Sequence, residues 1–270
     1  MFVRSALREI PFSLLILLVW GLMAIIGPLL PLQPDEMNLD VKLQGFQWSA
    51  WFGYDDLGRP VLHRLIDGAG ISFFVSITVV TISLSIGTFI GIYSAYTGGW
   101  VDAVLVRIID VFIAFPGILL VIALAGVLGP GLDNVILAMA VAGWVGFARL
   151  ARAQVLSLKH RDHVQAAVAL GVSSFTIMRK HLLPLIAAPI IIEATFGIAA
   201  VIVAEAGLSF LGLGVQPPTA SWGNMIKDGT SYKLVAPHMV IAPGLMLIFV
   251  VLAVNRAGDW LRDRLDVKSR

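Results

Sequence analysis

The amino-acid sequence predicts an all-α membrane protein with six transmembrane helices and a helical hairpin between the fourth and fifth. Hydrophobic residues make up 58% of the 270 residues, charged residues only 13%, and the mean hydropathy is +0.90. A soluble domain carries about a quarter charged residues. Two further observations support a membrane protein: six long apolar stretches, and positive charges that fall mostly on one side of the predicted membrane. We therefore expect little room for a separate soluble domain.

Each predicted span has the length needed to cross a bilayer, about 20 predominantly apolar residues. The six stretches are residues 12–32, 71–96, 104–128, 135–156, 185–213 and 239–255. The first is long and lacks a small-residue cleavage site, so we expect an uncleaved span rather than a signal peptide. We divide the chain into residues 1–68, an N-terminal span with an outer loop, and residues 69–270, a five-span core with a connecting loop at 157–184.

Positive charges predict the orientation. With the N-terminus inside, only five of the 19 Lys and Arg residues fall in outer segments: Lys42, Arg59, Arg64, Lys227 and Lys233. The remaining 14 fall in inner segments, and they include Arg4, Arg8, Lys268 and Arg270. Cytoplasmic segments carry an excess of Lys and Arg. Both termini and the 157–184 loop are therefore predicted to be cytoplasmic.

Glycine and proline mark points of special helix geometry. Gly87-Thr-Phe-Ile-Gly91 has the spacing that permits close helix contact, and we expect this contact within the chain. Pro116, which follows Phe115, and Pro189 are expected to kink their helices.

The polar loop between the fourth and fifth spans predicts a two-helix hairpin. Asp162 and Gln165 have capping-box spacing, and Gly171 can end the first helix in a left-handed conformation. Ser173 or Ser174 can cap the second helix, and Pro184 marks the junction with the next span. The expected helical stripe consists of Val164, Ala167, Val168 and Gly171. Neighbouring alanines keep the surface shallow, so that a partner can approach closely.

Catalytic motifs are missing from the sequence. There is no P-loop, no H-E-x-x-H, no G-x-S-x-G and no cysteine. The net charge of +2 gives no indication of nucleic-acid binding. We expect neither an enzyme nor a bound cofactor. His160 and His163 lie a turn apart, but no third ligand accompanies them, so surface solvation is favoured over a metal site.

The hairpin resembles the conserved cytoplasmic loop of ABC-importer permeases, the EAA motif. Gln165-Ala166-Ala167, Gly171 and Leu183-Pro184 fall in nearly the expected register. Gln165 stands where the family has glutamate, which keeps the hydrogen bonding and loses the charge. Further motifs typical of the dipeptide/oligopeptide/nickel permease family occur in order at residues 55–59, 96–102, 115–116, 129–134, 148–152, 208–223 and 258–266. The long outer loop and the 208–223 motif resemble the C-type subunit.

The resemblance implies a multi-pass permease in a bacterial inner membrane. It would pair with a B-type permease, two ATP-binding subunits that hold ATP and Mg²⁺, and an extracytoplasmic solute-binding protein. The implied cargo is di- or oligopeptides, with nickel, metal-chelate or opine-type solutes and glutathione as alternatives. The residues that would contact the ATPase are Gln165, Ala166, Ala167, Leu170, Gly171, Val172 and Ser173.

Ionisable residues inside membrane spans are candidates for function. Asp110, Glu193 and Glu205 therefore become pore-lining candidates. Two alternatives stay open, because Asp110 can pair with Arg107 one turn earlier, and the glutamates can be buried structural groups. These acids could also serve an ion-coupled secondary transporter, although the chain lacks an evident inverted repeat. A non-transporting scaffold subunit is a third class.

The predicted outer loops offer candidates for docking the binding protein: Asp55, Asp56, Arg59, Pro217 and Trp222. The prolines and Trp222-Gly223 indicate an ordered loop. The alternative is that these loops only hold the ends of the spans.

Overall fold

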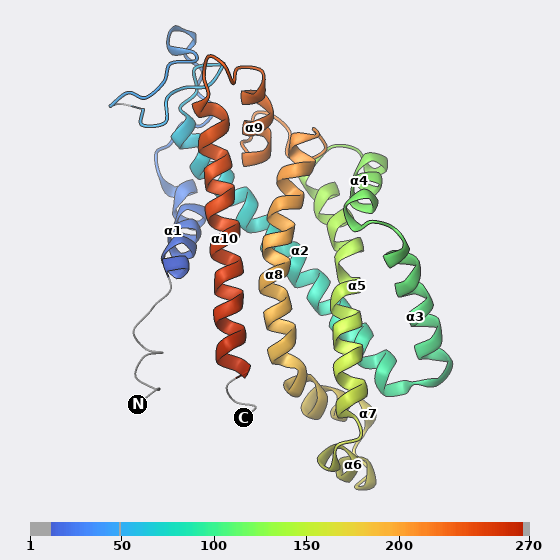
Figure 1. The fold of residues 1–270 in the computed structure, drawn as a ribbon. Coiled ribbons are helices and arrows are strands. Elements are labelled where there is room, and N and C mark those ends of the chain that lie inside the picture. Colours follow the sequence, from blue (N-terminus) through green and yellow to red (C-terminus); the bar gives the residue numbers. More distant parts are fainter. Residues whose placement is uncertain (1–11, 49, 267–270) are drawn as a thin grey trace, which may run out of the picture. The chain divides into compact units, whose positions relative to one another are not determined.

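The computed structural model describes residues 12–48 and 50–266, and in this part of the chain all regular structure is helical (Figure 1). The longer helices are α1 (Phe12–Ile26), α2 (Val61–Thr97), α3 (Gly99–Ala114), α4 (Gly117–Leu128), α5 (Leu132–Leu158), α6 (Asp162–Ala169), α8 (Leu183–Phe210), α9 (Trp222–Thr230) and α10 (His238–Asp266). Shorter ones are α7 (Ser174–Thr176), the 3₁₀ turns η1 (Gly27–Leu29) and η2 (Leu39–Val41), and the π-helical segment η3 (Ile177–Leu182). Arg4, Arg8, Lys268 and Arg270, which contributed to the predicted orientation, lie outside the described residues.

Five helical segments are long and apolar enough to span a membrane: Phe12–Leu29, Val61–Thr97, Leu132–Leu158, Ser174–Phe210 and His238–Leu265. The pair α3 and α4 makes a sixth if it counts as one broken span. The predicted all-α membrane fold is therefore confirmed, with five or six spans.

The third predicted span, residues 104–128, is not a single straight helix. α3 and α4 meet at an angle of 86°. Phe115 is extended (φ −95°, ψ 136°), as the residue before a proline prefers to be, and Pro116 has no N–H to continue the helix. The predicted kink is therefore a break. The second span also starts earlier than predicted, at Val61 instead of residue 71.

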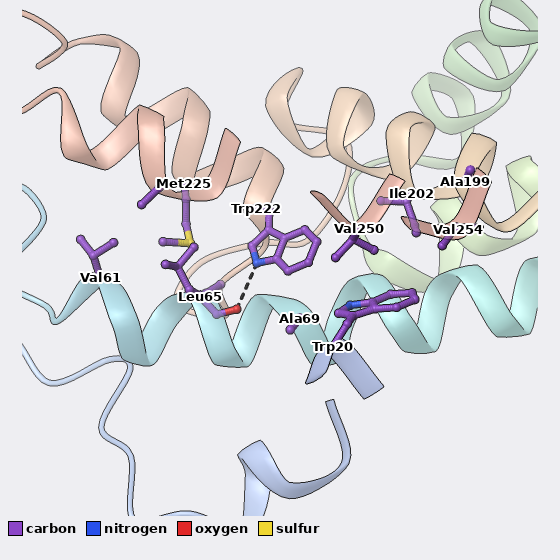
Figure 2. Close-up of a cluster of buried hydrophobic side chains, with 12 residues drawn as sticks. Trp20, Val61, Leu65, Ala69, Ala199, Ile202, Trp222, Met225, Val250 and Val254 are labelled. Atoms are coloured by element: carbon purple, nitrogen blue, oxygen red, sulfur yellow. Dashed lines mark hydrogen bonds between the residues drawn. The ribbon is translucent and has the colours of Figure 1, made fainter. Parts of the chain in front are cut away.

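The chain forms two compact units, and the first consists of Met1–Thr78, Leu124–Ile136 and Ile198–Ala257. Its core gathers buried apolar side chains from α1, α2, α8, α9 and α10 around Trp222 and Trp20 (Figure 2). Trp20 packs edge-on against Phe73, with 5.1 Å between ring centroids. Burial of such large rings is a major source of packing energy.

The second unit consists of Val79–Ala123, Leu137–Gly197 and Gly258–Arg270. Here α2 and α5 approach closely at Gly87 and Gly91, as their spacing predicts. A methyl group on Gly87 would lie 2.2 Å from the carbonyl oxygen of Trp144, and one on Gly91 would lie 2.3 Å from that of Ala148. The absence of a side chain at both positions is therefore what allows this contact.

Candidate functional site

The hairpin predicted between the fourth and fifth spans is present and directly joins α5 to α8. In Figure 1, α6 and α7 lie at the end of α5. α5 ends at Leu158, α6 covers Asp162–Ala169, and α7 leads through η3 into α8 without a break. The segment from Ser174 to Phe210 is continuously helical, so α7 and the candidate membrane span belong to one helical segment.

The two turns of the hairpin have the predicted stop and start signals. Gly171 has φ +75°, its N–H donates to the carbonyl of Val168, and the N–H of Val172 donates to that of Ala167. This pair of bonds is the Schellman motif that ends many helices. Ser173 caps α7, because its hydroxyl accepts a hydrogen bond from the Thr176 N–H.

The predicted capping box at the start of the hairpin is wrong. Arg161, not Asp162, is the N-cap residue of α6, and its side chain makes no capping hydrogen bond. Asp162 is instead the first helical residue, where its charge favours the helix dipole. The Gln165 side chain donates a 2.9 Å hydrogen bond to the Lys159 carbonyl, just before the helix. Gln165 therefore anchors the base of the hairpin.

One face of the hairpin is packed against the protein and the other is exposed. Val164 and Ala167 are buried, as are Ile177 and Leu182 in η3. The predicted stripe is therefore only half right, since Val168 and Gly171 lie on the exposed side. Leu170 at the tip is 83% exposed. Together with the exposed Val168, Leu170 forms an apolar patch on this face of the hairpin, and exposed apolar patches can mark interaction surfaces.

The remaining residues predicted to contact the ATPase also differ in their exposure. Ala166, Gly171 and Ser173 are exposed, and Val172 is partly buried. Phe175, which sequence reasoning did not single out, is also exposed and adds a large apolar side chain to the α7 part of the hairpin.

The intramembrane acids have different surroundings. Asp110 is exposed, and no ion pair joins it to Arg107 in the part of the chain described, which differs from the local pair considered above. Glu193 is also exposed, and its carboxylate lies close to Gly146 of α5. Glu205 is only 1% exposed and accepts hydrogen bonds from Ser209 (2.7 Å) and Ser72 (3.4 Å).

Glu205 belongs to a network that shapes the loop after α8. The Ser209 hydroxyl also accepts from the Val215 N–H, and the Asn224 side chain donates to the Val215 carbonyl. A methyl group on Gly214 would lie 2.0 Å from that hydroxyl, so the loop folds tightly over it. Buried polar groups are stable only when hydrogen-bonded in this way. Ser72, which is far from Glu205 in sequence, carries no local signal for this role.

Three of the five docking candidates are buried by internal contacts. The Asp55 carboxylate accepts from Arg59 Nε at 2.6 Å and from the N–H groups of Leu57 and Arg59, and both charged side chains are buried. Trp222 is fully buried, and its indole N–H donates to the Leu65 carbonyl. Asp56 and Pro217 are more accessible.

A guanidinium ties loop segments of the first unit together. Arg64 is buried and donates to the carbonyls of Pro34 and Pro218 and to the Asp35 carboxylate. Sequence reasoning counted Arg64 only as an outer positive charge. These three hydrogen-bonding partners are far away in sequence, and nothing local predicted them. A fourth group, the Asp55 carboxylate, lies nearer in the chain and is 3.7 Å from Arg64 Nε.

Metal-ligating residues do not gather in groups of three or more anywhere in residues 12–48 and 50–266. His160 and His163 are both exposed on or beside the hairpin.

Comparison with known proteins places this fold and hairpin in a family. Residues 87–270 match the family described as binding-protein-dependent transport system inner membrane component. The chain is 41% identical over 259 residues to the dipeptide transport system permease protein DppC of Alkalihalophilus pseudofirmus, covering 96% of this chain and 85% of DppC. It is 44% identical over 236 residues to the glutathione transport system permease protein GsiD of Escherichia coli, covering 87% and 76% of the two chains.

The fold also resembles a solved structure, the MetNI methionine ABC transporter in an inward-facing conformation. The TM-score is 0.62 at 20% identity, with 76% of this chain and 97% of that chain covered. The chain belongs to the binding-protein-dependent transport system inner membrane component family. It is a multi-pass inner-membrane permease subunit of an ABC importer, and such subunits are not themselves enzymes. Membership implies ATPase and binding-protein partners.

Proposed function

We propose that this permease forms half of a heterodimeric pore with a B-type subunit and that its hairpin receives the force of ATP hydrolysis. Two partner ATPases would bind ATP and Mg²⁺, and both termini and the hairpin would lie in the cytoplasm beside them. An extracytoplasmic binding protein would deliver the cargo. Family membership favours this ATP-driven scheme over an ion-coupled transporter or a scaffold.

The observation that carries the coupling role is the exposed tip of the hairpin. Leu170 is almost fully exposed next to Gly171, on a short helix with small side chains. Such a surface fits a cleft on another protein, while the buried residues Val164 and Ala167 hold it to the permease. Closure of the ATPase dimer would then move α7, η3 and α8 together, as in a domain closure transmitted through a packed contact.

Substitutions at the tip test this role. Gly171→Asp and Leu170→Asp are expected to leave the amount of chain in the membrane unchanged and to abolish ATP-driven uptake. The reason is that Leu170 is exposed and nothing lies within 4 Å of a Cβ placed on Gly171, so neither aspartate would enter the permease core. Normal uptake by either variant would contradict the coupling role.

The proposed cargo is a short peptide. DppC is named for dipeptides and GsiD for glutathione, and glutathione is itself a small peptide. The nickel, metal-chelate and opine alternatives have no comparable support among these relatives. The test is uptake of radiolabelled dialanine, glutathione or ⁶³Ni²⁺ by cells lacking this chain, compared with cells in which it is restored. Restoration of nickel uptake alone would overturn the peptide assignment.

The acids have proposed roles that differ with their burial. Asp110 and Glu193 are exposed and remain candidates for lining the pore. For Glu205 we favour the structural role, because its hydrogen-bonding partners are serines of the same chain. At the outer end, Asp56 and Pro217 are better placed to meet a binding protein than the buried Asp55, Arg59 and Trp222.

A further inference from the structure

Asp102 and Arg152 form a two-pronged ion pair between α3 and α5. Arg152 donates through Nε and Nη2 to the two carboxylate oxygens of Asp102, and both hydrogen bonds are 2.7 Å long. The Ser94 hydroxyl donates to the same carboxylate. Bidentate arginine–carboxylate pairs are stronger and more directional than single contacts. Asp102 also lies in the first turn of α3, where a negative charge favours the helix dipole.

A second contact links the turn between α2 and α3, residues 94–102, to the base of the hairpin. The Lys159 ammonium donates a 2.9 Å hydrogen bond to the carbonyl of Ala95, near the end of α2. The carbonyl of Lys159 in turn accepts from Gln165 in α6. The connection between α2 and α3 is sharp, because Gly98 and Gly99 both have positive φ. A short, rigid turn is thus tied to α5 at two points.

We propose that Asp102 and Arg152 are positioning residues that make the 94–102 turn and the hairpin move as one body. A displacement of the hairpin would then reach α2 and α3 as well as α8. This inference rests on the proposed coupling role of the hairpin. Asp102 belongs to the sequence motif at residues 96–102, and Arg152 belongs to the motif at residues 148–152. Neither motif contributes a residue to the proposed coupling surface.

The ion pair can hold the 94–102 turn to α5 because both of its side chains are only partly exposed. The Asp102 side chain is 19% exposed and that of Arg152 is 29% exposed, so water screens their attraction less than at an open surface. Loss of one partner leaves the other without its counter-charge. The 94–102 turn would then be held to α5 by Lys159 alone among these contacts.

Distance measurements between two spin labels test the proposal without knowledge of the cargo. The chain has no cysteine, so Ala103→Cys and Leu170→Cys label only the start of α3 and the hairpin tip. The purified complex with its ATPases is measured by pulsed EPR without nucleotide and with ATP plus vanadate. In the wild-type background we expect one narrow distance distribution that is the same in both states.

The variants should uncouple the two labels. In Asp102→Asn and in Arg152→Gln, the distance distribution is expected to broaden, or to shift between the two nucleotide states. In the double variant that exchanges the charges, Asp102→Arg with Arg152→Asp, the distribution is expected to be narrower than in either single variant but broader than in the wild type. Partial rescue is expected because arginine is less favourable at the start of α3. Arg149→Gln, an exposed arginine on the same helix, is the matched control and should behave as wild type.

The outcomes separate the two proposals. Unchanged narrow distributions in Asp102→Asn and Arg152→Gln would overturn the role of the pair while leaving the hairpin's role intact. A Leu170 label whose mobility is the same with and without ATPase subunits would overturn the coupling role itself. The yield of assembled complex is recorded for every variant, and a broadened distribution at wild-type yield is the result that supports the pair.

Discussion

The indole N–H of Trp222 donates a 3.0 Å hydrogen bond to the carbonyl oxygen of Leu65, which joins the start of α9 to the first turns of α2 (Figure 2). The ring is fully buried, and Gly68 leaves room for it, since a methyl group there would lie 2.9 Å from the indole. Trp222 therefore ties the start of α9 to α2 within the first unit.

Replacing Trp222 should lower stability in two steps. Trp222→Phe keeps most of the buried ring and loses the hydrogen bond, which costs about 1 kcal/mol. Trp222→Ala also creates a cavity and should cost about 3–5 kcal/mol. The measurement is the thermal unfolding of the detergent-solubilised complex. If Trp222→Phe left the Tm unchanged but weakened the interaction with the binding protein, Trp222 would be a docking residue after all.

Asp55 and Asp56 are neighbours with different surroundings, and they form a matched pair. Asp55→Ala removes the closer of the two carboxylates beside the buried Arg59 and should cost about 3–5 kcal/mol. Asp56 lies 3.9 Å from Arg59 and is more exposed, so Asp56→Ala should lower the Tm far less. Equal losses of Tm would show that the Asp55–Arg59 pair does not hold the loop.

The sequence was a good guide wherever the signal was local. Apolar stretches of spanning length, Gly171 at the end of α6 and Ser173 at the start of α7 each depend on neighbouring residues, and all were predicted. Pro116 gave the position of the break after α3, but its size depends on how α3 and α4 pack, which the sequence does not contain.

Most of the errors and omissions share one cause, which is partners distant in sequence. Ser72 meets Glu205, Arg64 meets Pro218, and Trp222 meets Leu65 only because the helices fold back on one another. Sequence reasoning therefore placed Trp222 on a docking surface. The capping box failed for a smaller reason, since the Gln165 side chain found a carbonyl at Lys159 in place of the predicted N–H group.

Gly87 is expected to tolerate no larger side chain. Gly87→Val would push against the backbone of α5 at Trp144 and should sharply reduce the amount of folded chain in the membrane. Gly244→Val is the control, because nothing lies within 4 Å of the corresponding position in α10. The readout is the amount of protein extracted from membranes in monodisperse form. Similar yields of the two variants would contradict the close packing of α2 on α5.

Gly171 is constrained by its backbone and not by space. Its φ of +75° is unfavourable for most side chains, although nothing lies within 4 Å of the missing Cβ. Gly171→Val should distort the turn and reduce uptake strongly, whereas Gly171→Asn, which accepts this conformation better, should retain more activity. Uptake assays at matched expression compare them. Equal activity of the two variants would argue against a requirement for this turn geometry.

Cross-linking from the tip of the hairpin tests the central claim most directly. A single cysteine at Leu170, in a chain that otherwise has none, is labelled with a maleimide that carries a photoactivatable benzophenone, which reacts with C–H groups of any neighbouring protein. The assembled complex is irradiated, and the product is identified by mass spectrometry. Leu234→Cys is the control, because Leu234 is at least as exposed as Leu170 and lies on the predicted outer side. We predict a cross-link from residue 170 to an ATPase subunit and none from residue 234. Absence of any ATPase cross-link from residue 170 in an active complex would contradict the proposal that the hairpin couples ATP hydrolysis to transport.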